Sequence, residues 1–276
     1  MVTKSDIAQE LKEAIGKAQI GLRYVSRHDL ATGRLAARVG YLRWQHPQYG
    51  EIHPLELVRL AEVTGQAADL TRAALHRLQT DFAAFTPQWS QGTRISFGAP
   101  RRHILHEDFI GDVERFLAES AIPPERLELR ISVQAGFWRA ASDFNSLAER
   151  GVQLVVDDLG QGMAWPLDWL SRAPMHGLQL NRDWVTAMQS DPNAFNLCRA
   201  GLAIAKAYAL TPIAASVDEP VQRDILLSLG CLQGSGDLYR DELTPPPGRV
   251  VGSRTVVTAS GLERTTPFTG TAFLSG

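Results

Sequence analysis

Two adjacent carboxylates, Asp157 and Asp158, directly follow an apolar run in the stretch VQLVVDDLGQG, residues 152–162. A continuous apolar run is typical of a buried parallel strand, and Gly160 and Gly162 turn the chain after it. Carboxylates at the C-terminal end of such a strand lie where α/β folds place their chemistry. Because like charges repel, the pair requires a metal, a cation or a shared proton. The stretch predicts an acidic metal or acid/base site; the alternative is one helix-capping and one surface aspartate.

The composition excludes several classes of protein. The chain has 276 residues, of which 44% are hydrophobic, and 28 basic and 30 acidic side chains give a net charge of -2. These interspersed charges indicate neither a nucleic-acid partner nor a membrane surface. No apolar run reaches the ~20 residues of a membrane span, and residues 1–19 resemble a polar amphipathic helix rather than a signal peptide. Cys198 and Cys231 lack metal-type spacing, so we expect buried thiols and a cytoplasmic location.

Predicted strands alternate with predicted helices along most of the chain. Pro54 begins a helix that Gly65 ends, a longer helix covers 67–85, and RISFGAP from Arg94 is a strand. This alternation predicts a βα-repeated fold. About eight strands over about 240 residues fit a TIM-like (β/α)8 barrel, with a doubly wound open sheet as the alternative.

The end of the chain has a different character. We assign residues 1–243 to the barrel and residues 244–276 to a C-terminal arm. TPPPG is a stiff linker, and VVGSRTVVTASG predicts a β-hairpin or an extended arm. Such an arm either packs on the barrel or pairs with a partner chain.

Several motifs in order resemble one family, the EAL-domain cyclic di-GMP phosphodiesterases. The resemblance covers about residues 20–242 and rests on YLRWQHPQYGEIHPLELVRLAE, DDLGQG, LQLNRDWV, AASVDEPVQ and LGC. Each motif alone is weak, but the ordered series is specific. The resemblance implies a TIM-like barrel with its site at the C-terminal ends of the strands. It also implies descent from enzymes that hydrolyse a cyclic dinucleotide with two metal ions.

The same resemblance shows departures at the family's metal-binding positions. Its namesake Glu-Ala-Leu falls on Val39-Gly40-Tyr41, so an isopropyl group stands where a metal carboxylate is expected. The Glu-x-x-Glu pair of a later strand falls on Arg130 and Val133, whereas the paired aspartates are kept.

Further positions depart in the same direction. The family's strand asparagine falls on Ser96, and the lysine that orients the attacking water falls on Gln179. The later metal glutamate falls on Ala215 and a glutamine near the end on Ser235. Two-metal hydrolysis needs several carboxylates, and Mg²⁺ needs near-octahedral oxygen ligation. We therefore expect no catalytic residue, no bound metal and no cofactor.

Arg130 places a fixed positive charge where the family holds a cation. We expect its guanidinium to bridge Asp157 or Asp158 by a charge-assisted hydrogen bond, which requires a separation under about 6 Å. The alternative is that Arg130 points to solvent.

Other residues are candidates for binding a ligand or a partner. Arg43 matches the family arginine that meets a ligand phosphate, but it is alternatively a structural partner of Glu62. Tyr41 replaces a leucine that packs on a guanine, so it either stacks on a base or fills the vacated metal pocket. Trp165 and Trp169 are base-stacking or partner-binding aromatics if exposed, and Trp169 is alternatively a core residue.

The histidines indicate structural roles. His46 and His53 flank the loop HPQYGEIHP, but no third metal ligand is suitably spaced. We expect His103 and His176 at the surface. No Ser/His/Asp order or glycine-rich phosphate loop is present, so the sequence contains no independent enzyme signature.

These observations predict a catalytically inactive EAL-like domain that acts as a regulatory, protein-binding module in bacterial cyclic di-GMP-related signalling. The alternative is a receptor that binds cyclic di-GMP without cleaving it, and a residual metal-dependent phosphodiesterase ranks third. The protein partner is not identified, and homodimerisation, common in the family, stays open. The candidate ligand-binding residues are Tyr41, Arg43, Arg130, Asp157, Asp158 and Gln179.

Overall fold

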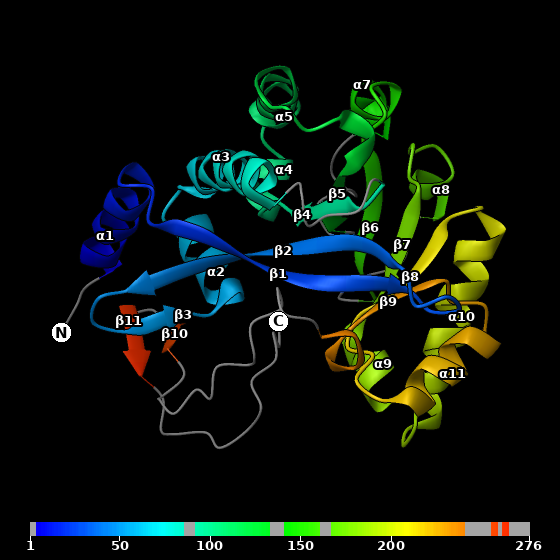
Figure 1. Cartoon of the computed structure of the whole chain (residues 1–276). Coiled ribbons are helices and arrows are strands. Elements are labelled where there is room, and N and C mark those ends of the chain that lie inside the picture. Colours follow the sequence, from blue (N-terminus) through cyan, green and yellow to red (C-terminus); the bar gives the residue numbers. More distant parts are fainter. Residues whose placement is uncertain are drawn as a thin grey trace.

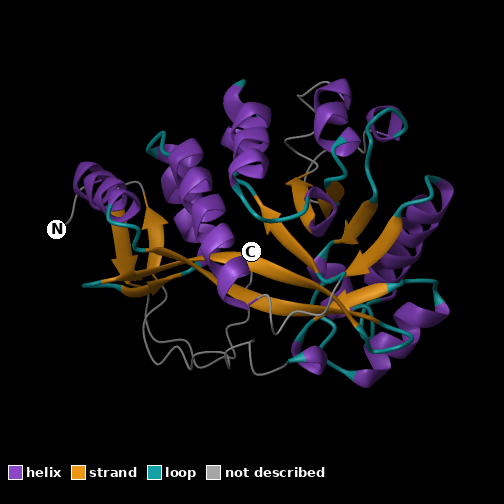
Figure 2. Ribbon diagram, turned by 45° about the horizontal axis from the view of Figure 1, so that its top comes forward, coloured by secondary structure: helices purple, strands orange, loops and turns teal. Residues whose placement is uncertain are grey.

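Eight strands close into a barrel surrounded by helices in the computed structural model (Figures 1 and 2). The structure describes residues 4–85, 92–132, 141–160, 167–240, 255–258 and 261–264. Around the barrel the strands run β1-β9-β8-β7-β6-β5-β4-β2, and β2 pairs back with β1. The predicted TIM-like barrel is thereby confirmed.

The barrel strands and the short strand β3 beside them have the following bounds. They are β1 Ile20–Asp29, β2 Leu35–His46, β3 Gly50–Ile52, β4 Arg94–Gly98, β5 Leu127–Ser132, β6 Gln153–Leu159, β7 Gly177–Leu180, β8 Thr211–Ala214 and β9 Gln233–Ser235. The helices are α1 Lys4–Gly16, α2 Pro54–Val63, α3 Ala67–Phe85, α4 Arg101–Ile104, α5 Asp108–Glu119, α7 Asn145–Glu149, α8 Leu167–Leu170, α9 Arg182–Ala187, α10 Pro192–Ala207 and α11 Pro220–Ser228. Short 3-10 turns lie at Pro124–Arg126, Ala141–Phe144 and Asp237–Tyr239.

The first strand of the barrel differs from the others in direction. β1 runs antiparallel to β2 and to β9, whereas the remaining barrel pairs are parallel. A tight turn joins β1 to β2, with Gly33 at φ +70 and the Asp29 carboxylate accepting from the backbone and hydroxyl of Thr32. Glycine adopts positive φ without strain, so the turn returns the chain directly into β2.

Two local predictions need correction. The stretch HPQYGEIHP is not entirely loop, because β3 pairs antiparallel with the end of β2 beyond the barrel. The sequence over 141–149 predicts a single helix, but the structure has a 3-10 turn at Ala141–Phe144 followed by the short helix α7.

The end of the chain forms a separate two-stranded sheet. Strands β10 Thr255–Thr258 and β11 Gly261–Arg264 pair antiparallel. β10 lies beside α2 and β11 beside α1 (Figure 1). The predicted boundary between residues 243 and 244 falls outside the described residues.

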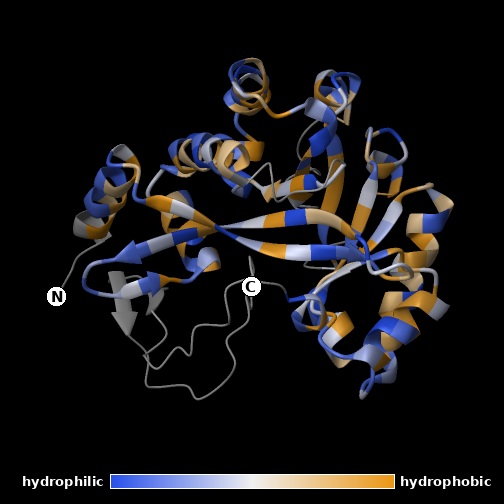
Figure 3. Ribbon diagram, viewed as in Figure 1, coloured by the Kyte–Doolittle hydropathy of each residue, from blue (hydrophilic) through white to orange (hydrophobic). Residues whose placement is uncertain are grey.

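Apolar and polar residues alternate along the helices and the long strands β1 and β2 (Figure 3). This pattern lets each element turn one side to the core and the other to water. Cys198 and Cys231 are buried free thiols, as predicted. Among the described helices, none is long and apolar enough to cross a membrane.

A buried ion pair lies inside the barrel, below the C-terminal ends of the parallel strands. Arg27 of β1 donates to both carboxylate oxygens of Glu128 on β5, with Nη1 at 2.8 Å from Oε1. The two side chains are only 1% and 3% exposed. Burial by itself raises the pKa of Glu128, but the Arg27 guanidinium outweighs it and holds that pKa below its usual range. Each charge therefore depends on the other to remain inside the barrel.

We expect Arg27→Met to lower the free energy of unfolding by roughly 3–5 kcal/mol, because it leaves the Glu128 carboxylate buried without its partner. Arg27→Met combined with Glu128→Leu should be more stable than Arg27→Met alone, because no unpaired charge remains. Urea unfolding of both variants and of Glu128→Leu measures the coupling. Losses that simply add would contradict a buried interaction between the two side chains.

Candidate functional site

A cavity of about 240 Å³ lies at the barrel mouth, where the parallel strands end. Parallel pairing sets Ser132 of β5 beside Asp157 of β6, and Gln179 enters from β7. On the opposite side, Leu55 and Val58 of α2 give the cavity an apolar wall. Five of the six predicted ligand-binding residues line this cavity: Tyr41, Arg130, Asp157, Asp158 and Gln179.

Asp157 is the centre of the polar contacts in the cavity. Its Oδ2 accepts from Arg130 Nη1 at 3.2 Å, and its Oδ1 accepts from Gln179 Nε2 at 2.6 Å. Oδ1 also accepts the backbone N–H of Asp158 at 2.8 Å. The carboxylate thus joins β5, β6 and β7, and both of its oxygens are already engaged by donors of this chain.

Arg130 is buried and held on three sides. Its side chain is 7% exposed, and Cζ lies 5.0 Å from the centre of the Tyr41 ring. A Cβ at Gly98 would meet Nη2 at 3.3 Å, so the glycine leaves the room that the guanidinium occupies. Burial opposes the charge, but Tyr41, Asp157 and Glu128 together raise the pKa of Arg130 above its usual value. The predicted bridge to an aspartate is confirmed, and the solvent-pointing alternative is wrong.

Asp158 has a different environment from its neighbour. Its backbone has φ +60, and the β6–β7 register shifts there, so the chain bulges at this residue. Its carboxylate makes no hydrogen bond or ion pair with another described residue. Burial, with the Asp157 charge second, raises the pKa of Asp158 to about 7, although Arg130 acts in the opposite direction. Neither aspartate caps a described helix. Asp157 is paired with the Arg130 guanidinium, whereas the Asp158 carboxyl holds its proton close to neutral pH.

The turn after Asp158 is packed against α9. A Cβ at Gly160, where φ is +91, would overlap the indole of Trp184. Only glycine fits both the backbone and the contact at this position. The glycine was predicted as a turn residue, but its contact with Trp184 was not, because sequence spacing does not show which helix covers the turn.

Arg43 lies outside the cavity, and its predicted alternative partner is wrong. Its side chain is 47% exposed, and Nε lies 3.4 Å from Glu51 Oε2 on β3. Glu62 instead accepts the backbone N–H of Arg102 at 3.1 Å. The β3 strand, which the sequence did not indicate, brings Glu51 beside Arg43.

The histidines are structural, but not all are where we expected them. His46 Nδ1 accepts backbone N–H groups of Gln48 and Tyr49, and Nε2 lies 2.9 Å from Glu10. His53 Nδ1 accepts the N–H of Leu55 at 3.3 Å and so caps α2.

His103 is 1% exposed, so its predicted surface position is wrong. His176 is half-buried, and its Nδ1 accepts the N–H of Leu154. Trp169 is half-buried and packs edge-on against Phe144 at 6.2 Å. Trp165 and Val133 lie outside the described residues.

The residues present do not fit a pair of divalent metal ions. Among the described residues, no group of three or more His, Cys, Asp or Glu side chains could hold one. Asp157 is occupied by Arg130, Gln179 and a backbone N–H, so the site retains one unengaged carboxyl, Asp158. A dication about 4 Å from the Arg130 guanidinium would be repelled by roughly 8 kcal/mol at an effective dielectric constant of about 20.

We expect Asp158→Asn to gain stability relative to the wild type as the pH rises from about 5 to about 8. The raised pKa means that the folded protein holds a proton that the unfolded chain releases near pH 4, so this stabilisation is lost as the pH rises through about 7. The gain should be on the order of 2 kcal/mol in the free energy of unfolding, measured in urea at both pH values. Asp168→Asn is the control, because that side chain is 86% exposed. Equal pH profiles for all three proteins would contradict a protonated Asp158.

The sequence profile of the EAL domain matches residues 8–241. Curated relatives include the uncharacterized protein sll1895 of Synechocystis, 27% identical over 237 residues, covering 85% of this chain and 34% of that protein. Another is the cyclic di-GMP phosphodiesterase PA2567 of Pseudomonas aeruginosa, 26% identical over 244 residues, covering 85% of this chain and 40% of that protein. The chain spans between about a third and two fifths of the length of these relatives.

Solved structures of the same fold include the PaMucR phosphodiesterase in complex with c-di-GMP. It has a TM-score of 0.78 and 23% identity, covering 84% of this chain and 95% of that chain. The FimX EAL domain of Pseudomonas aeruginosa bound to c-di-GMP has a TM-score of 0.72 and 16% identity, covering 85% of this chain and 94% of that chain. With the profile match over most of its length, this chain belongs to the EAL domain family.

Proposed function

We propose that this chain is an EAL domain that does not hydrolyse cyclic di-GMP and acts instead by binding another protein in cyclic di-GMP-related signalling. The observation that most directly supports the absence of hydrolysis is the Arg130–Asp157 pair at the barrel mouth, 3.2 Å between Nη1 and Oδ2. It gives Asp157 a guanidinium as its counter-charge, so the aspartate is stabilised without a metal ion.

A guanidinium cannot replace a metal ion in hydrolysis. A metal lowers the pKa of a bound water and so supplies a nucleophile, whereas an arginine only donates hydrogen bonds. Gln179 is neutral and already donates to Asp157, so it supplies no base for the attacking water. Val39 and Ala215 add no oxygen donor to the barrel mouth. The chain therefore retains the shape of the family's site without its means of activating water.

A second candidate is a receptor that binds cyclic di-GMP without cleaving it. The cavity, its apolar wall at Leu55 and Val58 and the Tyr41 ring support it. The relatives solved with c-di-GMP bound support it as well. Against it, Arg43 pairs with Glu51 outside the cavity, and Asp158 is a further carboxyl that would repel a phosphate once ionised. We therefore rank it below protein binding.

Mixing the protein with cyclic di-GMP and Mg²⁺ should give neither turnover nor heat of binding. Turnover is not expected because Arg130 is the counter-charge of Asp157, and binding is not expected because Arg43 pairs with Glu51 outside the cavity. Chromatography of the nucleotide products and calorimetry of the same mixture test both parts at once. PA2567, named as a phosphodiesterase, is the positive control.

The outcomes of that experiment separate the candidates. Heat of binding at micromolar concentration that Arg43→Ala abolishes, but Arg59→Ala on the exposed side of α2 does not, would establish the receptor instead. Turnover lost in Asp157→Asn would contradict both candidates and require a metal site.

A protein partner should be captured from the native cell by the full chain, and we expect a chain ended after Leu243 to lose it if the C-terminal arm forms the interface. Mass spectrometry of the captured proteins identifies the difference, and circular dichroism checks that the shortened barrel is folded. An unchanged set of partners would place the interface on the barrel. No specific partner with either chain would contradict the proposed protein-binding role.

A further inference from the structure

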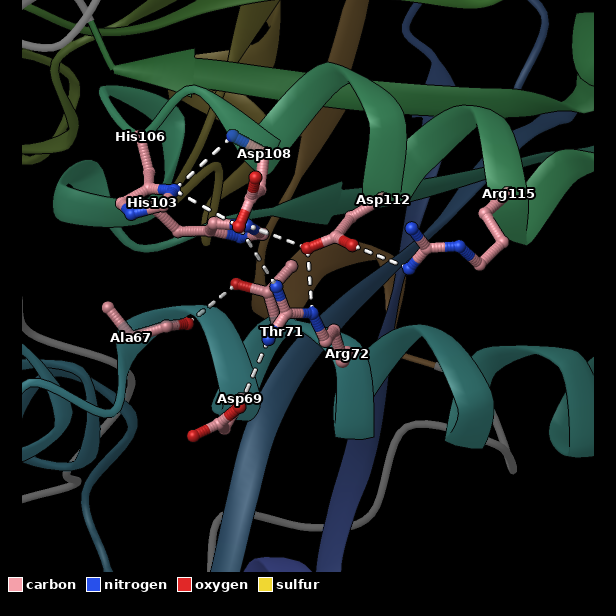
Figure 4. A network of polar contacts seen from close by, with 9 residues as sticks. All are labelled: Ala67, Asp69, Thr71, Arg72, His103, His106, Asp108, Asp112 and Arg115. Atoms are coloured by element: carbon pink, nitrogen blue, oxygen red, sulfur yellow. Dashed lines mark hydrogen bonds and ion pairs between the residues drawn. The ribbon is translucent and has the colours of Figure 1, made fainter.

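A second polar cluster lies away from the barrel mouth, between α3, α4 and α5 (Figure 4). Asp112 of α5 is its centre and accepts from Arg72 Nε at 2.7 Å and from Arg115 Nη1 at 3.0 Å. Nε2 of His103, on α4, lies 3.2 Å from the same carboxylate. We call Asp112, Arg72, His103 and Arg115 the Asp112 cluster. It connects the three helices α3, α4 and α5.

His103 is held in the cluster with one ring nitrogen paired and the other bare. Its side chain is 0% exposed and its ring packs edge-on against Phe109 at 5.2 Å between centroids. Because a carboxylate only accepts, the proton must be on Nε2, facing Asp112. Nδ1 is buried and has no hydrogen-bond partner. A second proton would therefore create a buried N–H with no acceptor in place, which is costly.

The charges around His103 act in both directions. Burial disfavours the imidazolium most strongly and lowers the pKa of His103, Asp112 favours it, and Arg72 and His106 oppose it. Arg72 is itself balanced by Asp69 at 3.1 Å from Nη1.

Asp108, at the solvent-exposed rim of the Asp112 cluster, adds a further negative charge beside Arg72. Asp108 lies 3.6 Å from Arg72 Nη2 and 3.5 Å from the ring of His106, whose side chain is 53% exposed. The cluster and its rim thus contain three carboxylates and two guanidinium groups. Geometry and charge agree that His103 is neutral near pH 7 and can gain its second proton only if the packing around Nδ1 opens.

The cluster is connected to the barrel mouth through α4. This helix begins at Arg101, two residues after Ala99, and Gly98 and Ala99 line the cavity. Gly98 also leaves the room for the Arg130 guanidinium. On its other side, the backbone of Arg102 donates to Glu62 of α2, the helix that forms the apolar wall. Movement of α4 would therefore displace two walls of the cavity.

We propose that the Asp112 cluster is an acid-sensitive latch that holds α4 between α3 and α5 and releases it when His103 takes up a proton. The released helix changes the β4–α4 wall of the barrel-mouth cavity. This device is independent of whether the barrel hydrolyses, binds or ignores cyclic di-GMP.

Hydrogen exchange of the full chain between pH 7.5 and pH 5 tests the latch. After correction for the intrinsic pH dependence of exchange, amides of α4 should open more often below about pH 6. The limit for one coupled proton is about tenfold per pH unit. His103→Gln keeps an amide N–H for Asp112 but cannot titrate, so its α4 should exchange independently of pH. His106→Gln is the matched control and should keep the wild-type acid response.

Wild-type α4 amides that stay protected to pH 5 would overturn the latch, as would an unchanged acid response in His103→Gln. If His103→Gln does not fold, nitrogen NMR of the wild-type histidines decides. The latch requires that His103 Nδ1 stays unprotonated until the amides of α4 begin to open. Protonation of Nδ1 without such opening would contradict it.

Discussion

The pair between Arg130 and Asp157 determines how charge is arranged inside this barrel. It lies above a second buried pair, Arg27 with Glu128, and Glu128 also contributes to the charge around Arg130. Taking any of these groups out of water is costly unless an opposite charge is next to it. The barrel therefore contains alternating positive and negative groups from its interior to its mouth. Removing one member would leave its neighbour buried and unpaired, so these residues act as one set.

The identity of the cation at the barrel mouth decides what the site can do. A metal ion and a guanidinium both stabilise a buried carboxylate, but only the metal ionises a bound water near neutral pH. Arg130 donates directionally to Asp157, stacks against Tyr41 and fills the space beside Gly98. The proposed absence of hydrolysis would thus follow from the presence of Arg130 beside Asp157, in a barrel whose fold is retained.

The sequence predicts most of the fold and one key contact of the site, but not the partners supplied by distant segments. The barrel is predictable because its strands are apolar runs between helices, and the Arg130–Asp157 contact because neighbouring parallel strands end at one edge. The predicted partner of Arg43, Glu62, was wrong because β3 pairs with β2 beyond the barrel and brings Glu51 beside Arg43. The predicted surface position of His103 was wrong because its burial depends on how α3 and α5 pack, which no local sequence pattern shows. Tertiary pairing, rather than propensity, decides these positions.

Two titrating groups in this protein, the half-buried Asp158 and the buried His103, respond to pH in opposite senses. Asp158 has a raised pKa, so the stability that its proton provides is present at low pH and lost as the pH rises through about 7. His103 has a lowered pKa, so the stability of its neutral form is present at higher pH and lost as the pH falls below its unfolded value, about 6.5. Acid therefore favours the carboxyl pair at the barrel mouth while weakening the helices that support the cavity wall. The two groups thus oppose the folded structure at opposite ends of the pH range: protonation of His103 at low pH, and ionisation of Asp158 at high pH.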